Sequence, residues 1–435
     1  MAGGVCSPSM SLNITIITVG SRGDVQPYVA LGLALTRAGH AVTVATHETF
    51  RTFVTDRGLA FAPVAGDPRG ILGAATADRW LQSGRHRHLV TATREFLGQV
   101  RPLLDAMLAD FWRVSRGADL VIYSAVAAPC AQMGVPSVAA FLQPLHRTGA
   151  FPMLRVPQSW RLGPGFNTRT YAAVEWIVWR IFRGAINAWR ADTLGLGPGG
   201  APGPASIVPA VYGFSPTVVP RPSDWHPDIA VTGYWVLETP NDWRPPSVLT
   251  DFLAAGPPPV AIGFGSMTPR SAERLTTVAV EALRESGQRG ILLGGWGALG
   301  AGATRDDVLV IDECPHEWLF PRTAAVVHHG GAGTTGAALR GGTPSIVVPL
   351  GFDQPYWAGR VAALGVGPRG ISRRRLTSAW LARAIRQAVD DPAMRSRAAA
   401  IGRSLRAERG AETAAAIVAR HCPSSSPRSS SYRDA

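Results

Sequence analysis

The chain repeats one order of secondary-structure signals, once near its start and once in its second half. A β-branched run leads into a glycine turn, then into a helical pattern that ends at Gly39, and then into a second apolar run. This order predicts a βαβ unit, in which a crossover helix joins two parallel strands. In the first half we expect strands at 13–19, 41–45, 119–123 and 137–141, and a helix at 25–38.

The same order restarts after residue 258. Between the two units lies a Pro- and Trp-rich stretch (234–258), which is typical of an interdomain linker. The sequence therefore predicts two parallel-sheet domains of the α/β class. In the second half we expect strands at 259–264, 290–293, 324–328 and 345–348, and helices at 271–286, 334–340 and 354–364.

The composition indicates a folded protein with anionic partners. A chain of 435 residues allows two or three domains, and 46% hydrophobic with 17% charged residues excludes a disordered, collagen-like or disulfide-scaffold protein. The net charge is +13, and every basic residue is an arginine. Such a charge favours nucleic acid, acidic membrane surfaces or phosphorylated substrates. Because the sequence has no zinc-finger spacing, RNP-type strand or basic heptad region, we expect no nucleic-acid partner.

Cysteines and apolar runs bound the cellular setting. Cys6, Cys130, Cys314 and Cys422 form no C-x-x-C pair, which argues against a metal site or a disulfide framework and fits a reducing cytoplasm. The first ten residues do not have the pattern of a signal peptide, and no run of roughly 18 apolar residues is present to span a membrane. We expect disordered tails at 1–11 and 423–435.

The strongest motif is HHGGAGTT at 328–335, between an expected strand and an expected helix. Its glycines let backbone N–H groups approach a ligand, the helix N-terminus favours an anion, and Thr334 and Thr335 offer hydroxyl donors. The lysine of a Walker loop is missing, and the glycine spacing differs from the usual Rossmann fingerprint. The motif predicts phosphate binding, and the alternative is a tight strand–helix turn with a threonine N-cap.

Two further motifs lie where strands lead into helices. PLGFDQ at 349–354 ends with Asp353 and Gln354, which either suit sugar hydroxyls or form a helix N-cap pair. GSRGDVQP at 20–27 contains Asp24, which either caps the first helix or is a carboxylate placed to accept a proton. Local sequence leaves both alternatives open.

At these three motifs the chain resembles the family 1 glycosyltransferases of the GT-B fold, and among them the bacterial and fungal sterol 3-β-glucosyltransferases. The resemblance extends from about residue 12 to 420 and is carried by GSRGDVQPYVALGLALTRAGH, FSPTVVPRPSDWHPDIAVTGYW, IGFGSM and CPHEWLFPRTAAVVHHGGAGTTGAALRGGTPSIVVPLGFDQPYWAGRV. It implies two facing Rossmann-like, doubly wound domains with a cleft between them. The implied boundaries are 12–233 for the acceptor-binding domain, 234–258 for the linker, 259–400 for the nucleotide-sugar-binding domain and 401–422 for a C-terminal helix that crosses back.

The resemblance also implies the site residues. Asp24 would be the base for an inverting displacement at the anomeric carbon, and His329 with the helix N-terminus would hold the leaving diphosphate without a metal ion. The co-substrate is expected to be UDP-glucose, and no further cofactor is implied. The donor-binding set is Ser21, Arg22, Gly23, Gly265, Ser266, Pro315, His316, His329, Gly331, Gly333, Thr334, Thr335, Asp353 and Gln354.

Two positions depart from the plant members of the family. Ala337 replaces the glutamate that holds the ribose there, and Glu313 lies near the position of the tryptophan that stacks on uracil. Both UDP and dTDP therefore stay open as the donor nucleotide.

The expected acceptor is a sterol or a similar lipophilic hydroxylated molecule. A helix predicted over 171–189 carries an apolar stripe from Trp179 to Trp189, with arginines on another side. It is either a core helix, or a wall of the acceptor pocket, or a surface that touches a membrane peripherally. We expect acceptor contacts from His146, Trp179 and Phe182, with His146 as the alternative base.

Three other functions share part of this pattern. A dTDP-deoxysugar-dependent transferase of polyketide or macrolide antibiotic biosynthesis is the nearest alternative. An NDP-sugar 2-epimerase would need its own acid and base carboxylates and no large acceptor region. A catalytically silent partner of another transferase should have lost the donor motifs, whereas HHGGAGTT and FDQ are intact.

Overall fold

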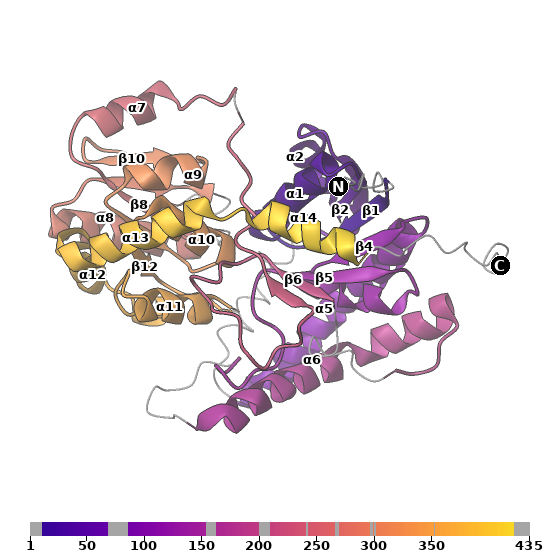
Figure 1. The fold of residues 1–435 in the computed structure, drawn as a ribbon. Helices are drawn as coiled ribbons and strands as arrows, with labels where there is room; N and C mark the ends of the chain where they lie inside the picture. Colours follow the sequence, from indigo (N-terminus) through magenta and orange to yellow (C-terminus); the bar gives the residue numbers. More distant parts are fainter. Residues whose placement is uncertain are drawn as a thin grey trace.

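Two parallel β-sheets, each covered by helices, form the centres of two domains (Figure 1). The chain passes from the first domain to the second after β7 (Ile229–Val231) and returns between α13 (Pro392–Ala407) and α14 (Gly410–Arg420). The computed structural model describes residues 11–67, 86–153, 162–199, 209–240, 242–265, 269–295, 299, 302–351 and 353–421.

The first sheet has seven strands in the order β3-β2-β1-β4-β5-β6-β7, and the paired strands are parallel. Helices cover both faces of this sheet, and its middle strand β4 is apolar and buried at every position. The strands are β1 (Asn13–Ile17), β2 (Ala41–His47), β3 (Ala60–Val64), β4 (Leu120–Tyr123), β5 (Ser137–Phe141), β6 (Ala210–Tyr212) and β7 (Ile229–Val231); the helices are α1 (Arg22–Arg37), α2 (Arg51–Thr55), α5 (His86–Ser115) and α6 (Gly163–Leu194).

The second sheet has five parallel strands in the order β10-β9-β8-β11-β12. Its strand order reverses between β8 and β11, where ligands of doubly wound sheets bind. The strands are β8 (Val260–Gly263), β9 (Gly290–Leu293), β10 (Val308–Ile311), β11 (Ala325–His328) and β12 (Ser345–Val347); the helices are α7 (Ser247–Ala254), α8 (Pro269–Ser286), α9 (His316–Leu319), α10 (Ala332–Gly341), α11 (Gln354–Ala363) and α12 (Ser378–Asp390).

Every strand that the sequence predicts is present, with its ends moved by no more than about two residues. The fold predictions for two Rossmann-like domains are therefore confirmed. The prediction omitted β3, β6, β7 and β10. The β3 strand contains a proline, β6 and β7 have only three residues each, and β10 is a four-residue strand at the edge of its sheet. These strands form only because neighbouring strands already provide a ladder to pair with.

The stretch 234–258 is packed over part of its length. It contains α7, whose Leu249 is fully buried together with Ala261 and Ile291 in the core of the second domain. This half of the stretch therefore belongs structurally to the second domain, and the extended segment before α7 makes the connection.

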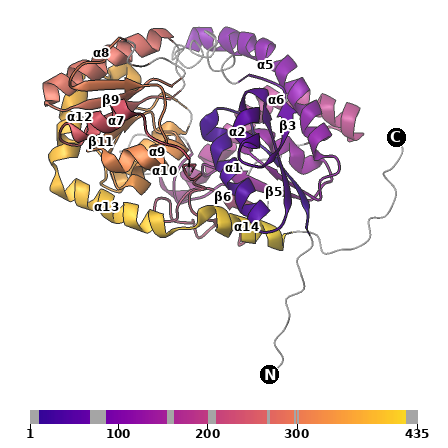
Figure 2. The ribbon, with the colours of Figure 1, turned by 90° about the horizontal axis from the view of Figure 1, so that it is seen from above.

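Two helices, α13 (Pro392–Ala407) and α14 (Gly410–Arg420), run from the second domain back to the first (Figure 2). The α14 helix packs on α1, and Ala411, Ala414 and Val418 lie buried in the core of the first domain. The crossing is tight, since a Cβ at Gly410 would come within 2.4 Å of the Tyr234 carbonyl oxygen on the other connection. The two connections therefore touch where they cross.

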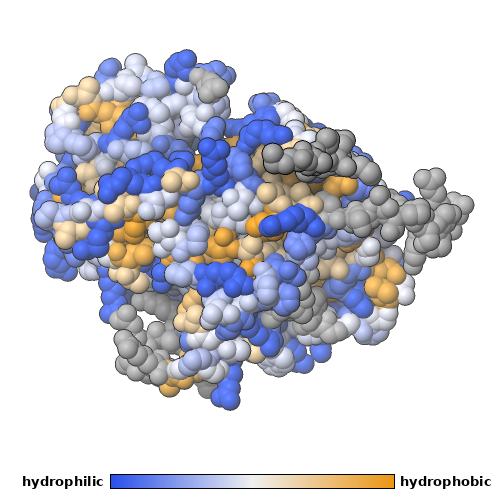
Figure 3. Space-filling model, viewed as in Figure 1, coloured by the Kyte–Doolittle hydropathy of each residue, from blue (hydrophilic) through white to orange (hydrophobic). Residues whose placement is uncertain are grey.

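One hydrophobic core extends across the domain junction. The rings of Phe214 and Trp357, one from each domain, lie 6.0 Å apart. The Arg360 guanidinium on α11 donates to the Val218 carbonyl oxygen at 2.6 and 2.9 Å. These contacts fix α11 against the first domain. On the face shown in Figure 3, apolar residues form separate patches among hydrophilic ones.

Candidate active site

The turn after β1 fixes Asp24 as the third residue of α1. Its Oδ2 accepts hydrogen bonds from the Ser21 N–H at 2.8 Å and the Ser21 hydroxyl at 2.9 Å. Gly20 has a φ of +135°, and a Cβ there would lie 2.5 Å from Oδ2. Asp24 therefore caps the helix, but both bonds use the same carboxylate oxygen, which leaves Oδ1 available for another task.

Asp24 is open to solvent, but the protein around its carboxyl partly desolvates that group. Desolvation raises its pKa above the usual value, although the Ser21 hydrogen bonds lower it. A carboxylate with a raised pKa is a stronger base at neutral pH than an ordinary one.

His329 follows β11 and lies between two glycine backbones. A Cβ at Gly265 would come within 3.0 Å of the imidazole, and one at Gly331 within 2.6 Å. Gly331 is the N-cap of α10, so the free N–H groups of the first helical turn lie next to this loop. The alternative of a threonine N-cap is wrong, because Thr334 is the third residue inside the helix. His329 Nδ1 and Thr335 Oγ1 are buried without a partner among the described residues.

Three neutral imidazoles gather at this loop. Desolvation lowers the pKa of His316 and His329 to about 4 and that of His328 to about 3, and each of the three interacts electrostatically with another. His328 Nδ1 accepts from the Gly330 N–H at 3.1 Å, which places the proton of the neutral ring on Nε2. The His316 ring stacks on Phe320, with centroids 4.4 Å apart. The loop therefore offers uncharged hydrogen-bonding rings beside a helix N-terminus.

Asp353 is the N-cap of α11 and Gln354 its first residue, and hydrogen bonds hold both side chains. Asp353 Oδ2 accepts from Trp357 Nε1 at 2.7 Å, and Gln354 Oε1 accepts from the backbone N–H groups of Leu350 and Gly351 at 2.7 and 3.1 Å. These bonds orient both side chains and leave Asp353 Oδ1 and the Gln354 amide nitrogen for a ligand. Desolvation, together with the charge of Asp24, raises the pKa of Asp353 to about 6, although the hydrogen bond from Trp357 lowers it.

The first-domain turn and the second-domain loops meet. Asp24 and Asp353 interact electrostatically across the junction, and Arg22 forms an ion pair with Glu313 at 2.5 Å. The positive charge of Arg22 also contributes to the low pKa of His316, which follows Pro315 at the start of α9. The structure therefore gathers the predicted residues of both domains at one place, including Ser21 and Gly23 on the α1 turn and Gly333 and Thr334 on α10.

The predicted acceptor residues are not gathered in this way. Trp189 is 6% exposed and lies in the core, while Trp179 and Phe182 are half-buried. Arg190 hydrogen-bonds Gln132 and the Gly197 carbonyl oxygen, so it is a structural residue. Much of the stripe on α6 thus packs inward, and the large hydrophobic residues of α6 that the structure leaves exposed are Trp176, Ile177 and Val178.

His146 is buried in an aromatic cluster on the acceptor side. Its Nδ1 lies 2.5 Å from the Tyr212 hydroxyl, which also accepts from the backbone N–H groups of Leu145 and His146 at 3.0 Å each. The ring of Trp225 stacks on Tyr212 with centroids 4.8 Å apart. Since one imidazole nitrogen is engaged by Tyr212, His146 is less suited than Asp24 to serve as the base.

Ser266 lies outside the described residues.

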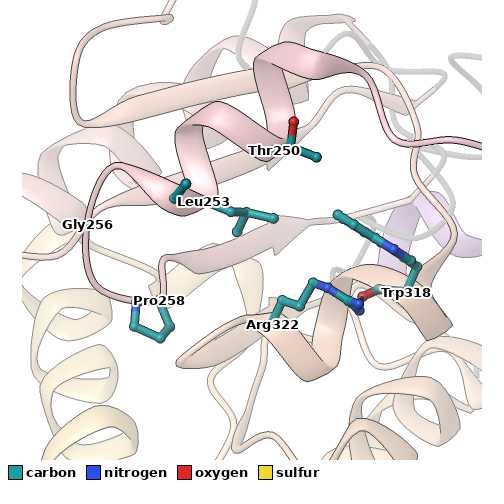
Figure 4. Close-up of a pocket in the computed structure, with 7 residues that line it drawn as sticks. Thr250, Leu253, Gly256, Pro258, Trp318 and Arg322 are labelled. Carbon is teal, nitrogen blue, oxygen red and sulfur yellow. Dashed lines mark hydrogen bonds between the residues drawn. The ribbon is translucent and has the colours of Figure 1, made fainter.

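A groove of about 460 Å³ on the second domain lies between α7 and α9, with Leu253, Trp318 and Arg322 among its lining residues (Figure 4). The Arg322 guanidinium lies 4.3 Å from the centroid of the Trp318 indole. None of the predicted donor residues lines this groove, so it is separate from the candidate site.

Several residues of the site were missed by sequence reasoning. Trp357 holds Asp353, and its spacing of four residues on one helix was a signal that could have identified it. His47 Nε2 accepts from the Gly20 N–H at 3.2 Å, and Glu313 pairs with Arg22. These two contacts join distant segments, and no local pattern indicates them.

Comparison with known sequences identifies both ends of the chain. Residues 14–140 match the glycosyltransferase family 28 N-terminal domain, and residues 299–423 match the erythromycin biosynthesis protein CIII-like C-terminal domain. The sterol 3-beta-glucosyltransferase of Saccharomyces cerevisiae (strain YJM789) is 36% identical over 94% of this chain and 35% of that protein. The sterol 3-beta-glucosyltransferase of Emericella nidulans is 37% identical over 95% of this chain and 30% of that protein. The chain thus spans about a third of the length of these curated relatives.

Solved glycosyltransferase structures share the fold. The glycotransferase of kitacinnamycin aligns with a TM-score of 0.68 at 21% identity, covering 95% of this chain and 100% of that one. The glycosyltransferase VinC, solved in complex with dTDP, aligns with a TM-score of 0.62 at 20% identity, covering 94% and 99%. The predicted GT-B architecture is confirmed.

Proposed function

Because the chain belongs to the glycosyltransferases of the GT-B fold, we propose that it is an inverting, metal-independent hexosyltransferase that moves glucose from UDP-glucose to a hydroxyl of a sterol or similar lipophilic alcohol. One observation carries the proposal. Asp24, the proton acceptor of the first domain, lies within electrostatic range of Asp353, the first member of the sugar-binding pair of the second.

The reaction is a single displacement. The acceptor oxygen forms a bond to C1 of the sugar while the bond from C1 to the diphosphate oxygen breaks, and the electron pair leaves with the nucleoside diphosphate. The proton of the acceptor hydroxyl moves to Asp24 Oδ1, while Ser21 holds Oδ2. Attack on the face opposite the diphosphate converts an α-linked donor into a β-glycoside.

The leaving diphosphate gains charge as the bond breaks. The N–H groups at the start of α10 and the neutral imidazole of His329 donate hydrogen bonds to it. Asp353 Oδ1 and the Gln354 amide then hold the sugar hydroxyls. The nucleotide sugar is a co-substrate, and we propose that no other cofactor takes part.

A dTDP-deoxysugar transferase of natural-product biosynthesis is the second candidate. The solved structure of VinC with dTDP favours it at the level of the fold. The 36–37% identity to sterol 3-beta-glucosyltransferases over more than nine-tenths of the chain favours the first. Glu313, which is engaged by Arg22, replaces a stacking tryptophan and does not decide between uracil and thymine.

The test is a panel of UDP- and dTDP-sugars against sterols, macrolides and flavonoids, with the products read by mass spectrometry. The proposal expects a gain of 162 mass units, the general increment of one hexosyl group, on a 3-hydroxysterol with UDP-glucose. Transfer only from dTDP-sugars to a macrolide would replace the first proposal by the second.

We also propose peripheral contact with a membrane, in the cytoplasm. Among the described residues, no helix is both long and apolar enough to cross a bilayer. Trp176, Ile177 and Val178 on α6 are 62%, 48% and 48% exposed, and the Arg180 guanidinium lies 5.5 Å from the Trp176 ring centroid. An apolar surface flanked by arginine suits the interface of an anionic bilayer, where lipophilic acceptors reside.

Sedimentation with vesicles of phosphatidylcholine and phosphatidylserine tests this contact. The double variant Trp176→Ala and Ile177→Ala should reduce the bound fraction. Val248→Ala, which removes an exposed apolar residue from α7 of the other domain, is the matched control. Equal binding of all three proteins would refute the contact.

A further inference from the structure

Two tyrosines with unbonded hydroxyl groups meet at the domain junction. Tyr171 lies on α6 of the first domain and is fully buried, and Tyr356 lies on α11 of the second. The Oη atoms of both are buried and form no hydrogen bond with the described residues. A buried hydroxyl without a partner destabilises a fold by about 1–3 kcal/mol. We call Tyr171 and Tyr356 the junction tyrosines.

The segment 149–153, which contains Phe151, connects the surroundings of the two side chains. The Asn167 amide donates to the Gly149 carbonyl oxygen at 2.8 Å, and the Met153 N–H donates to the Thr170 hydroxyl at 2.9 Å. These bonds fasten the segment 149–153 along the turn of α6 that precedes Tyr171. The Phe151 ring, within this segment, lies 5.4 Å from the Tyr356 ring. Electrostatic interaction with Tyr356 also raises the pKa of Tyr171, after desolvation, as expected for neighbouring hydroxyls.

Other buried phenols of the first domain are hydrogen-bonded. The Tyr28 hydroxyl donates to the Ala140 carbonyl oxygen at 2.6 Å, and the Tyr212 hydroxyl bonds His146 and two backbone N–H groups. Within the part of the chain that the structure describes, these buried phenols are satisfied, whereas the junction tyrosines are not. Tyr234 is also unbonded, but its ring packs against Gly336 of α10 at the chain crossing.

The junction tyrosines lie on the acceptor side of the candidate site and not beside the loop proposed to bind the nucleotide. Tyr356 lies one helical turn beyond Asp353, whose carboxylate is oriented by the next residue, Trp357. Tyr171 and Phe151 belong to the first domain, on α6 and on the segment that follows β5. The junction tyrosines thus lie between the sugar-binding helix and the side of the site that the acceptor occupies.

We propose that the junction tyrosines together bind an oxygen atom of the acceptor that is remote from the hydroxyl receiving the sugar. This inference rests on the proposed function and adds to it. Each phenol donates one hydrogen bond, so the partner is a keto or hydroxyl oxygen, and Phe151 packs against the apolar rings beside it. The preferred acceptors are accordingly steroid-like alcohols with a second oxygen. A hydroxyl of the transferred sugar makes the same hydrogen bonds. A deoxy donor in the experiment below distinguishes that case from an oxygen of the acceptor.

The experiment compares two 3β-hydroxysteroids that differ only in a 17-keto group. The wild-type enzyme should favour the keto acceptor by roughly ten- to a hundredfold in kcat/KM, the worth of two buried hydrogen bonds. Tyr171→Phe and Tyr356→Phe should each raise the KM of the keto acceptor by about tenfold and leave that of the deoxy acceptor and of UDP-glucose unchanged. Tyr234→Phe removes an equally unbonded hydroxyl elsewhere at the junction and should leave the preference intact.

Three results would overturn the inference. The first is that Tyr171→Phe and Tyr356→Phe lose equal activity with both acceptors, and the second is that Tyr234→Phe shows the same loss. The third is a loss that disappears with UDP-2-deoxyglucose or another deoxy donor, which would assign the pair to the sugar. Tryptophan-fluorescence titration of the two steroids reads the same preference without turnover. If wild-type enzyme glycosylates neither steroid, the proposed function fails. The binding ratio then still supports or refutes the role of the junction tyrosines.

Discussion

The donor loop and the acceptor side of the site are built in different ways. The donor loop uses consecutive residues of one strand–helix turn, in which His329 is framed by Gly331 and by Gly265 of the neighbouring strand. The acceptor side uses side chains from distant parts of the chain. Tyr212 on β6 holds the backbone of Leu145 and His146, and Asp224 accepts hydrogen bonds from Thr148 and Gly149 at 2.8 and 2.7 Å.

This difference shows which half of the site a sequence can specify locally. The donor half needs only glycines that admit backbone donors to a phosphate, so a short motif encodes it. The acceptor half depends on tertiary packing around a loop, and its residues can change together when the acceptor changes. Variants in each half, and at the place where the two halves join, show whether donor and acceptor binding depend on each other.

The largest effect is expected for Asp24→Asn, because in the proposed mechanism Asp24 of the first domain takes the proton of the acceptor hydroxyl that attacks the sugar held by the second. Its Oδ2 bonds to Ser21 tolerate an amide oxygen, so the variant should fold. Turnover should fall by about 10²–10⁴-fold, the usual contribution of a general base. Steady-state kinetics with circular dichroism as a folding control measure this. Near-full activity in a folded variant would reduce Asp24 to a helix cap.

Trp189→Ala shows whether the apolar stripe of α6 packs in the core or forms a wall of the acceptor pocket. Trp189 is 6% exposed within the first-domain core, so its removal should lower the free energy of unfolding by about 3–5 kcal/mol. Trp176→Ala on the same helix removes a 62% exposed side chain and should change stability by less than about 0.5 kcal/mol. Urea unfolding of the two variants gives the comparison. Similar losses would mean that the stripe does not face the core.

Sequence reasoning predicted the donor half for a physical reason that the acceptor half does not share. Strand–turn–helix order, the position of His329 and the pair Asp353–Gln354 follow from local pattern, and the structure brings them together. Helical periodicity also predicted an apolar stripe on α6, but periodicity does not say what covers the stripe. The partners Tyr212, Asp224 and Glu313 lie too far from their contacts in sequence for any spacing rule to find them.

The pH dependence of donor affinity should isolate the donor half. In the proposed site, the Asp353 carboxyl, with a pKa raised to about 6, must be ionised for its Oδ1 to accept hydrogen bonds from sugar hydroxyls. Donor affinity should therefore fall about tenfold per pH unit as the pH drops below about 6, and stay constant above 7. The imidazoles, with pKa values of about 3 to 4, stay neutral over this range.

Calorimetric titration of UDP-glucose from pH 5 to 8 measures this, and Asp353→Asn is the control. The variant should bind more weakly and lose the pH dependence below 6. A wild-type profile that is flat, or an unchanged profile in the variant, would show that Asp353 does not contact the sugar.

The smallest effect is expected on chelation. In the proposed mechanism, helix N–H groups and His329 take the role that a cation has in other transferases, so EDTA should leave turnover within about twofold of the untreated rate. Loss of activity with EDTA that magnesium or manganese restores would contradict this account of the diphosphate site.

The most direct test of the central claim is the anomeric configuration of the product. Wild-type enzyme is incubated with UDP-glucose, whose glucose is α-linked, and a 3β-hydroxysterol, and the product is examined by proton NMR. Direct displacement with Asp24 as base predicts one β-glucoside, identified by the large coupling of its anomeric proton, and one UDP per glucoside. An α-glucoside, or UDP release with free glucose as the only product, would contradict it.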